Sequence, residues 1–187
     1  MDLRERPQAE HEEPVRSIEQ SVDVERRQFA LCDGAAPFGD WQLPDRSRQT
    51  EMAVNSSGVM VSSTVAMHAA AVLLEFWGVE PSAAAAAPIG QVAVSLPSGT
   101  LTAWAVPHGP AGPALDLAGP GEYILRVFRE GGGEEARARA QREPEDLAGL
   151  ETYRVQAWRS PRACGDGLGS GEPVEVASAS AGTVLPW

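Results

Sequence analysis

The side chains best suited to chemistry in this sequence are three histidines, two cysteines and scattered carboxylates. His11 lies in a run of charged residues, His68 in an Ala-rich segment, and His108 in the sequence PHGPAGP. Nucleophilic catalysis needs a nucleophile, a neighbouring base and an orienting group. The spacing shows no G-x-S-x-G, Walker A or H-E-x-x-H pattern. We therefore predict no catalytic residues and a protein that is not an enzyme.

The glycine-rich run at residues 165–171, GDGLGSG, resembles two known motifs only superficially. Ser170 stands one position too late for a nucleophile elbow. The same serine occupies the place where a dinucleotide-binding loop has its third glycine. We interpret the run as a flexible linker.

The sequence offers no evident metal or cofactor site. Cys32 and Cys164 have no C-x-x-C spacing and are separated by most of the chain. Reduced thiols in a cytoplasmic protein are the simplest interpretation. We predict no metal and no cofactor.

One loop region combines acidic and aromatic residues. Asp33, Asp40 and Asp45 lie close together in sequence, and Trp41 follows Asp40. Trp104 alternates in phase with two threonines, in a position where it either packs in the core or contributes to an interface. We predict Asp33, Asp40, Trp41 and Trp104 as binding residues. A carboxylate-based hydrolase that uses Asp33, Asp40 and Asp45 is an alternative.

The net charge of −11 limits the choice of partner. Non-specific affinity for nucleic acid comes from Lys and Arg that neutralise phosphate, so direct nucleic-acid binding is not expected. An acidic surface instead favours a protein partner, and a basic one in particular, although solubility alone also explains such a charge. All 15 cationic side chains are Arg, which is typical of a GC-rich, actinobacterial genome.

No segment is long and apolar enough to be predicted as a membrane span. The uncharged run at residues 59–74 is interrupted by Ser62, Ser63, Thr64 and His68. The first ten residues are charged where a signal peptide has an apolar stretch, so we expect a cytoplasmic protein.

Most of the chain alternates apolar and polar residues with a period of two, which predicts strands. We expect strands at residues 22–31, 58–63, 71–77, 91–96, 100–106, 122–129 and 152–158. Pro97, Ser98 and Gly99 are expected to form a hairpin turn between two of them.

Two segments leave alternatives open. Residues 64–75 contain good helix formers, but Phe76 and Trp77 favour a strand in the second half. Residues 134–141 form either a helix, supported by Glu135 and Arg139 at i, i+4 spacing, or a solvated loop.

Short strands separated by Gly and Pro turns, without β-α-β alternation, predict an all-β fold, an antiparallel β-sandwich. We expect a short charged helical or loop insertion in it. We assign residues 1–19 to a disordered charged N-terminal tail, 20–158 to the sandwich, and 159–187 to a flexible tail rich in Gly, Ser, Ala and Pro.

Several stretches together resemble a known family. They are VDVERRQFAL at 22–31, Asp40-Trp41, Gly58-Val59, AVLLEFW at 71–77, SGTLTAWAV at 98–106, PGEYILRVF at 120–128 and YRVQAW at 153–158. In order and spacing they are similar to competence protein J, the inhibitor of a DNA-entry nuclease, and its uncharacterised actinobacterial relatives. The resemblance implies a small β-sandwich that binds a protein partner without catalytic residues of its own.

These observations lead to one main hypothesis about function and two alternatives. The main hypothesis is a cytoplasmic, non-catalytic β-sandwich that binds a protein, as an immunity or nuclease-inhibitor-like factor. The alternatives are a structural or accessory subunit of a phage-type or secretion-type assembly and the carboxylate-based hydrolase. The sequence does not indicate an oligomeric state.

Overall fold

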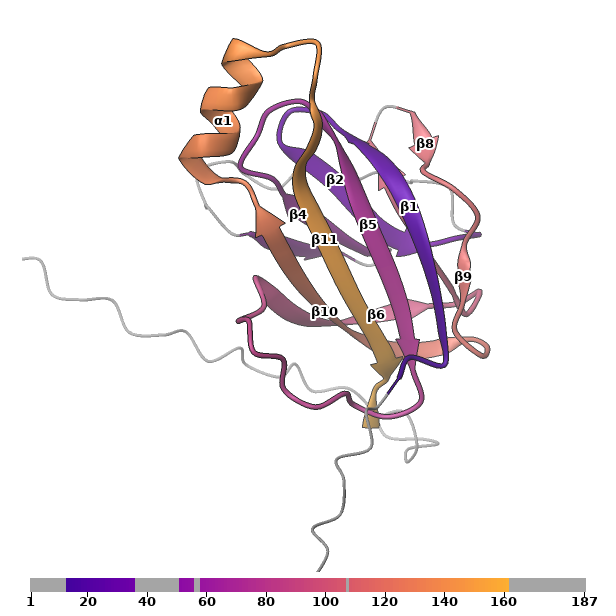
Figure 1. The fold of residues 1–187 in the computed structure, drawn as a ribbon. Helices are drawn as coiled ribbons and strands as arrows, with labels where there is room; N and C mark the ends of the chain where they lie inside the picture. Colours follow the sequence, from indigo (N-terminus) through magenta and orange to yellow (C-terminus); the bar gives the residue numbers. More distant parts are fainter. Residues whose placement is uncertain (1–12, 36–50, 56–57, 107, 162–187) are drawn as a thin grey trace, which may run out of the picture.

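The computed structural model describes residues 13–35, 51–55, 58–106 and 108–161, which form two β-sheets packed face to face (Figure 1). Sheet A has the strand order β1 (Arg16–Val24), β5 (His68–Trp77), β11 (Ala148–Arg159), β10 (Gly121–Gly131) and β6 (Gly90–Leu96). Sheet B has the order β3 (Met52–Asn55), β4 (Gly58–Ser62), β2 (Gln28–Asp33), β7 (Thr100–Ala105) and β8 (Gly109–Pro110), and β9 (Leu115–Asp116) also pairs with β7.

The predicted all-β sandwich is confirmed. Among the described residues, the strand pairs are antiparallel except β5 with β11, which run parallel at the centre of sheet A. The predicted strands at residues 58–63, 71–77, 91–96, 100–106, 122–129 and 152–158 correspond to β4, β5, β6, β7, β10 and β11. The charged insertion between β10 and β11 contains the helix α1 (Gly133–Arg142), so the helical alternative is correct.

The single strand expected at residues 22–31 is wrong, because the chain folds back within it. β1 ends at Val24 and β2 begins at Gln28, and the two strands belong to different sheets. The turn places Arg26 and Arg27 at φ angles of 51° and 66°. Left-handed backbone usually calls for Gly, Asn or Asp, so two arginines gave no sign of a turn.

The expected hairpin at Pro97, Ser98 and Gly99 is also corrected. This turn carries the chain from β6 in sheet A to β7 in sheet B. The Gly99 amide donates to Leu96 O at 3.0 Å, so the turn is tight, but the strands that it joins do not pair with each other.

The ambiguous segment at residues 64–75 becomes a loop followed by a strand. β5 begins at His68 and pairs with β1 on one side and β11 on the other. Its alternate residues Ala70, Val72 and Leu74 are fully buried against sheet B. Tertiary burial of a period-two face therefore outweighs the helix propensity of the Ala-rich sequence.

The core fills the space between the two sheets. Its fully buried members include Val22, Phe29, Leu31, Val72 and Leu125. Tyr123 closes one end of the core, where its hydroxyl donates to Leu117 O and Gly119 O, each at 2.6 Å. A second small cluster lies beneath α1, where Val65, Ala136 and Leu150 pack together.

Gln20 connects the two sheets through buried hydrogen bonds. It lies on β1, and its Nε2 donates to Thr102 Oγ1 at 3.3 Å and to Pro113 O at 2.7 Å. Its Oε1 accepts from the Ala103 amide of β7 at 2.8 Å. A buried side chain that satisfies both of its polar ends fixes the register of one layer against the other.

Replacing Gln20 with leucine is expected to lower the free energy of unfolding by about 2 kcal/mol. The leucine fills a similar volume but leaves the Ala103 amide and the Pro113 carbonyl without these partners. Urea denaturation measures the loss, with Ser21→Leu on the exposed face of β1 as the control. An unchanged midpoint for Gln20→Leu would show that the connection adds no stability.

The predicted domain boundaries stay predictions. β1 begins at Arg16 and β11 ends at Arg159, while residues 1–12 and 162–187, on which the predicted tails largely fall, lie outside the described residues. Within the described ranges, no helix has the length and apolar character needed to cross a membrane.

Candidate functional site

The four predicted binding residues are not brought together where the structure describes them. Asp33 is buried at the end of β2, where its Oδ1 accepts from the Ala35 amide at 2.9 Å and its Oδ2 from the Ser98 amide at 2.7 Å. Trp104 is half-buried and follows the alternation of β7 away from the core face. Asp40 and Trp41 lie outside the described residues, as does Asp45.

Sequence reasoning missed a buried polar cluster at the end of the core nearest α1. His68 on β5 and Glu151 on β11 both point between the sheets, with 0% of either side chain exposed. His68 Nε2 lies 3.1 Å from Ser63 Oγ and 3.4 Å from Glu151 Oε2. Glu151 also accepts from the Thr64 amide at 2.9 Å, from the Thr64 hydroxyl, and from the Tyr153 hydroxyl at 2.5 Å.

This cluster contains a serine, a histidine and a carboxylate, but its geometry is not that of a catalytic triad. A triad histidine uses one ring nitrogen for the nucleophile and the other for the acid. Here Ser63 and Glu151 both face Nε2, and Nδ1 has no hydrogen-bond partner among the described residues. Ser63 Oγ is further engaged by the backbone of Val65. The arrangement holds a loop and two strands together.

The pKa values agree with a structural role. Burial alone would raise the pKa of Glu151, but hydrogen bonds from His68, Thr64 and Tyr153 outweigh it and lower that pKa to about 2. Burial, followed by the contact with Glu151, raises the pKa of Tyr153. Elsewhere, burial and then the charge of Asp33 raise the pKa of Cys32 to about 12, which keeps this thiol protonated and unreactive.

The outer face of sheet A carries a hollow of about 280 Å³, which we call the outer hollow. It is lined by side chains on β1, β5, β11 and β10, namely Glu19, Ala71, Leu73, Phe128, Glu130, Thr152 and Arg154, together with Tyr153. Strand register explains its shape. Ala71 pairs with Thr152 and Ser21, so three small residues lie side by side, and the surface is lower there than on either flank.

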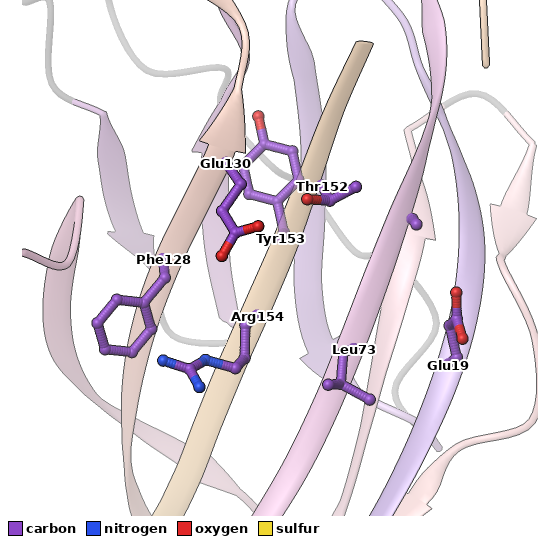
Figure 2. Close-up of a pocket in the computed structure, with 8 residues that line it drawn as sticks. Glu19, Leu73, Phe128, Glu130, Thr152, Tyr153 and Arg154 are labelled. Atoms are coloured by element: carbon purple, nitrogen blue, oxygen red, sulfur yellow. The ribbon is translucent and has the colours of Figure 1, made fainter. Parts of the chain in front are cut away.

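Arg154 and Phe128 line the outer hollow in the row of the sheet next to the three small residues. They are direct neighbours in the pairing of β10 with β11, and the Arg154 guanidinium lies 4.7 Å from the centroid of the Phe128 ring (Figure 2). Within the described part of the chain, Arg154 makes no ion pair or hydrogen bond, so its N–H groups are available to a ligand.

Two exposed carboxylates border this arginine. Glu19 is two strands away on β1, beyond Leu73, and Glu130 lies on β10 beside Thr152 (Figure 2). Glu19 lies in the same row as Leu73 and Arg154, whereas Glu130 lies in the neighbouring row with Thr152, so opposite charges alternate over this face but not along one row. Such alternation suits a surface that recognises complementary charges in a defined register.

The neighbouring part of the same face is already covered. Arg126 is stacked 4.7 Å from the Trp158 ring and bonds to Glu80 at 2.5 Å and Pro81 O at 3.2 Å. The loop after β5 therefore lies over this end of sheet A. The outer hollow is the part of the face between that loop and α1.

Among the residues that the structure describes, no group of three or more His, Cys, Asp or Glu side chains is placed to hold a metal ion. The sequence did place Arg154 and Phe128 on the faces opposite Val155 and Val127 by alternation. It gave no signal that β10 and β11 pair in the register that stacks them.

The fold places this protein in the class of two-sheet β-sandwiches, and its outer face carries a hollow. No family model and no curated protein matches the sequence. Among solved structures, the chain is similar to ComJ, inhibitor of the DNA degrading activity of NucA, from Bacillus subtilis. The identity is 16% and the TM-score 0.50, over 79% of this chain and 98% of that chain. A second similar structure, described as crocagin biosynthetic gene J, has 15% identity and a TM-score of 0.44, over 78% of this chain and 99% of that chain.

The similarity to ComJ confirms the remote resemblance to competence protein J, at the level of the fold.

Proposed function

We propose that this protein is a non-catalytic, nuclease-inhibitor-like factor that binds its partner through the outer hollow of sheet A. The observation that carries the proposal is the position of Arg154, which is stacked on Phe128 in a hollow and, among the described residues, makes no hydrogen bond or ion pair. The likeness to ComJ, which covers nearly all of that inhibitor, supports a nuclease as the partner.

The chemistry of the outer hollow fits a protein ligand better than a small metabolite. An arginine held on an aromatic ring loses little conformational freedom on binding, and Arg and aromatic residues are enriched at interface hot spots. The hollow is shallow, about the size of two or three side chains, and it lies on a flat sheet face rather than in a deep cleft.

The charge pattern indicates what the partner presents. Glu19 and Glu130 suit two basic side chains, and Arg154 between them suits one carboxylate. The net charge of −11 further favours a partner that is basic overall, and it accelerates encounter at low ionic strength. We also propose that the protein acts in the cytoplasm, with Cys32 reduced.

The test is a titration of DNA degradation by a NucA-like nuclease encoded in the same genome. Increasing amounts of the full chain should reduce the rate in a stoichiometric manner, with the free nuclease as the reference. Undiminished degradation at a large molar excess, or the lack of any such nuclease gene in that genome, would contradict the proposal.

Arg154→Glu is expected to weaken nuclease binding by about 30-fold, the effect of losing a central hot-spot side chain. The matched control is Arg137→Glu, which makes the same change of charge at an exposed position on α1. Calorimetric titration compares the two variants, and thermal unfolding verifies that both are folded. Equal losses in both variants would mean that net charge, rather than the outer hollow, controls binding.

A further inference from the structure

The two edges of sheet A differ in how well they are protected. At one edge, β1 carries Arg16, Glu19 and Asp23, and the Arg16 side chain bonds to the carbonyl and carboxylate of Asp116 beside it. At the other edge, β6 reads GQVAVSL, with no charge and no proline. Charges, prolines and covering segments are the usual means of preventing an edge strand from pairing with another chain. β6 has none of them within the described residues.

The hydrogen-bonding groups of β6 divide cleanly between its two sides. β6 pairs with β10 over seven consecutive residues without a bulge. The Ser160 amide donates to Glu122 O, so the backbone N–H and C=O groups of Glu122 and of the other even-numbered residues of β10 point to β11. Those of the odd-numbered residues point to β6. Gly90, Val92 and Val94 are paired with those odd-numbered residues, so their backbone N–H and C=O groups point to β10. The backbone N–H and C=O groups of Gln91, Ala93 and Ser95 therefore point to the open edge.

We propose that the open edge of β6 pairs with β6 of a second copy of this chain, antiparallel and centred on Ala93. In this arrangement Ala93 lies opposite Ala93 of the second copy, and Gln91 lies opposite its Ser95. All three residues are exposed, small or uncharged, so the pairing meets no clash and no like charges. The contact is the same on both copies and closes as a two-fold dimer.

The flanking residues complement each other across the same two-fold axis. Arg126 of β10 is in register with Gln91, and Glu122 with Ser95. Pairing Gln91 with Ser95 of the second copy therefore places a basic and an acidic side chain, and no like charges, in the same row on both sides of the axis. Arg126 keeps its own bonds to Gln91 at 2.7 Å and to Glu80 in this arrangement. On the same side of the sandwich, Val54 of β3 is 50% exposed, and β3 lies beside β6 through the contact of Met52 with Gly90. The second copy would cover this apolar side chain.

The dimer is expected to be weak and to depend on salt. Three residues from each copy exchange backbone hydrogen bonds, so we expect a contact at the lower end of the size range for specific interfaces. Two chains of net charge −11 repel each other, so higher ionic strength should strengthen the association. This direction is the opposite of that expected for binding of a basic partner, and the proposal stands independently of the nuclease-inhibitor function.

The test is sedimentation of the full chain over a range of concentrations up to about 1 mM, at about 50 mM and about 500 mM salt. A species of twice the 19.8 kDa chain mass should appear and increase with salt. Ala93→Pro removes the outward N–H of β6 but no bond to β10, because proline is tolerated on the open side of an edge strand. It should weaken the association at least 10-fold.

A second pair of variants keeps the result interpretable if Ala93→Pro perturbs the fold. Ala93→Lys places two like charges opposite each other on the axis and should also abolish the dimer, although it reduces the net negative charge. Ser21→Lys adds the same charge on β1, at the opposite edge, and should leave the dimer intact. A chain that is monomeric under all conditions, or a dimer that survives Ala93→Lys, would overturn the proposal.

Discussion

Replacing Glu151 with alanine is expected to lower the free energy of unfolding by about 3 to 5 kcal/mol, the usual cost of breaking a buried, paired charge. The carboxylate is fully buried and accepts hydrogen bonds from Thr64 and Tyr153, with His68 3.4 Å away. Its removal leaves several buried donors without an acceptor. Urea denaturation measures the loss, and Glu130→Ala on the exposed face of β10 is the matched control.

The same residue should make stability depend on pH in a defined window. The pKa of Glu151 is lowered from an ordinary value of 4.5 to about 2, so the folded state binds the proton less tightly than the unfolded state does. The contribution of Glu151 to the free energy of unfolding is therefore complete above pH 4.5, and it is lost as the pH falls through the pKa of this residue in the folded state. A pKa difference of this size corresponds to about 3 kcal/mol.

The variant Glu151→Gln isolates this contribution from that of the other carboxylates. It keeps a side chain of nearly the same size but cannot titrate. The difference in unfolding free energy between the native chain and this variant should shrink as the pH falls from about 4.5 to about 2. A difference that stays constant over that window would show that Glu151 does not carry a lowered pKa.

Gly99→Ala is expected to destabilise the protein by about 3 kcal/mol or more. Gly99 has a φ of 71°, and a Cβ at this position would lie 2.1 Å from the backbone carbon of Gly119. Left-handed backbone costs an alanine about 1 to 2 kcal/mol, and the clash with backbone atoms adds to this. The turn connects the two sheets, so it has little room to move without shifting β6 against β7.

Gly149→Ala separates the cost of a left-handed backbone from the cost of the steric clash. Gly149 has a similar φ of 66°, but nothing lies within 4 Å of a Cβ built on it. The free energy of unfolding of this variant should fall only by the cost of left-handed backbone for an alanine, about 1 kcal/mol. Thermal unfolding of both variants gives the comparison. Similar losses at the two positions would mean that the close approach to Gly119 is relaxed at little cost.

The layers of this fold could be predicted because alternation is a local signal. Val92, Val94 and Leu96 on one face of a strand, or Tyr123, Leu125 and Val127 on another, indicate burial of one side without knowledge of the partner strand. Strand pairing is not local. The parallel contact of β5 with β11, across more than 70 residues of sequence, leaves no mark on either strand.

The functional features were hidden for the same reason. Glu151 is a charged residue in an alternating strand, so the sequence alone does not predict that it is buried. Its partners His68 and Thr64 come from a different segment of the chain. The stacking of Arg154 on Phe128 depends on the register of β10 with β11. The predicted site residues Asp33 and Trp104 follow opposite faces of sheet B, so their sequence context did not indicate a common surface.

The inferred dimer would enlarge the surface available to a partner. The axis at Ala93 runs perpendicular to sheet A, so the outer faces of both copies would lie on the same side of one continuous sheet. Each copy would contribute one outer hollow. A partner with two binding sites would then gain affinity through the effective concentration of the second contact.

The most direct test of the proposed binding surface is an amide chemical-shift titration of the labelled full chain with the NucA-like nuclease. We expect the core positions of sheet B to stay unchanged and the largest changes to cluster on the outer face of sheet A, at Glu19, Leu73, Phe128, Glu130, Thr152 and Arg154. Changes confined to sheet B, or none at saturating nuclease, would contradict the proposal.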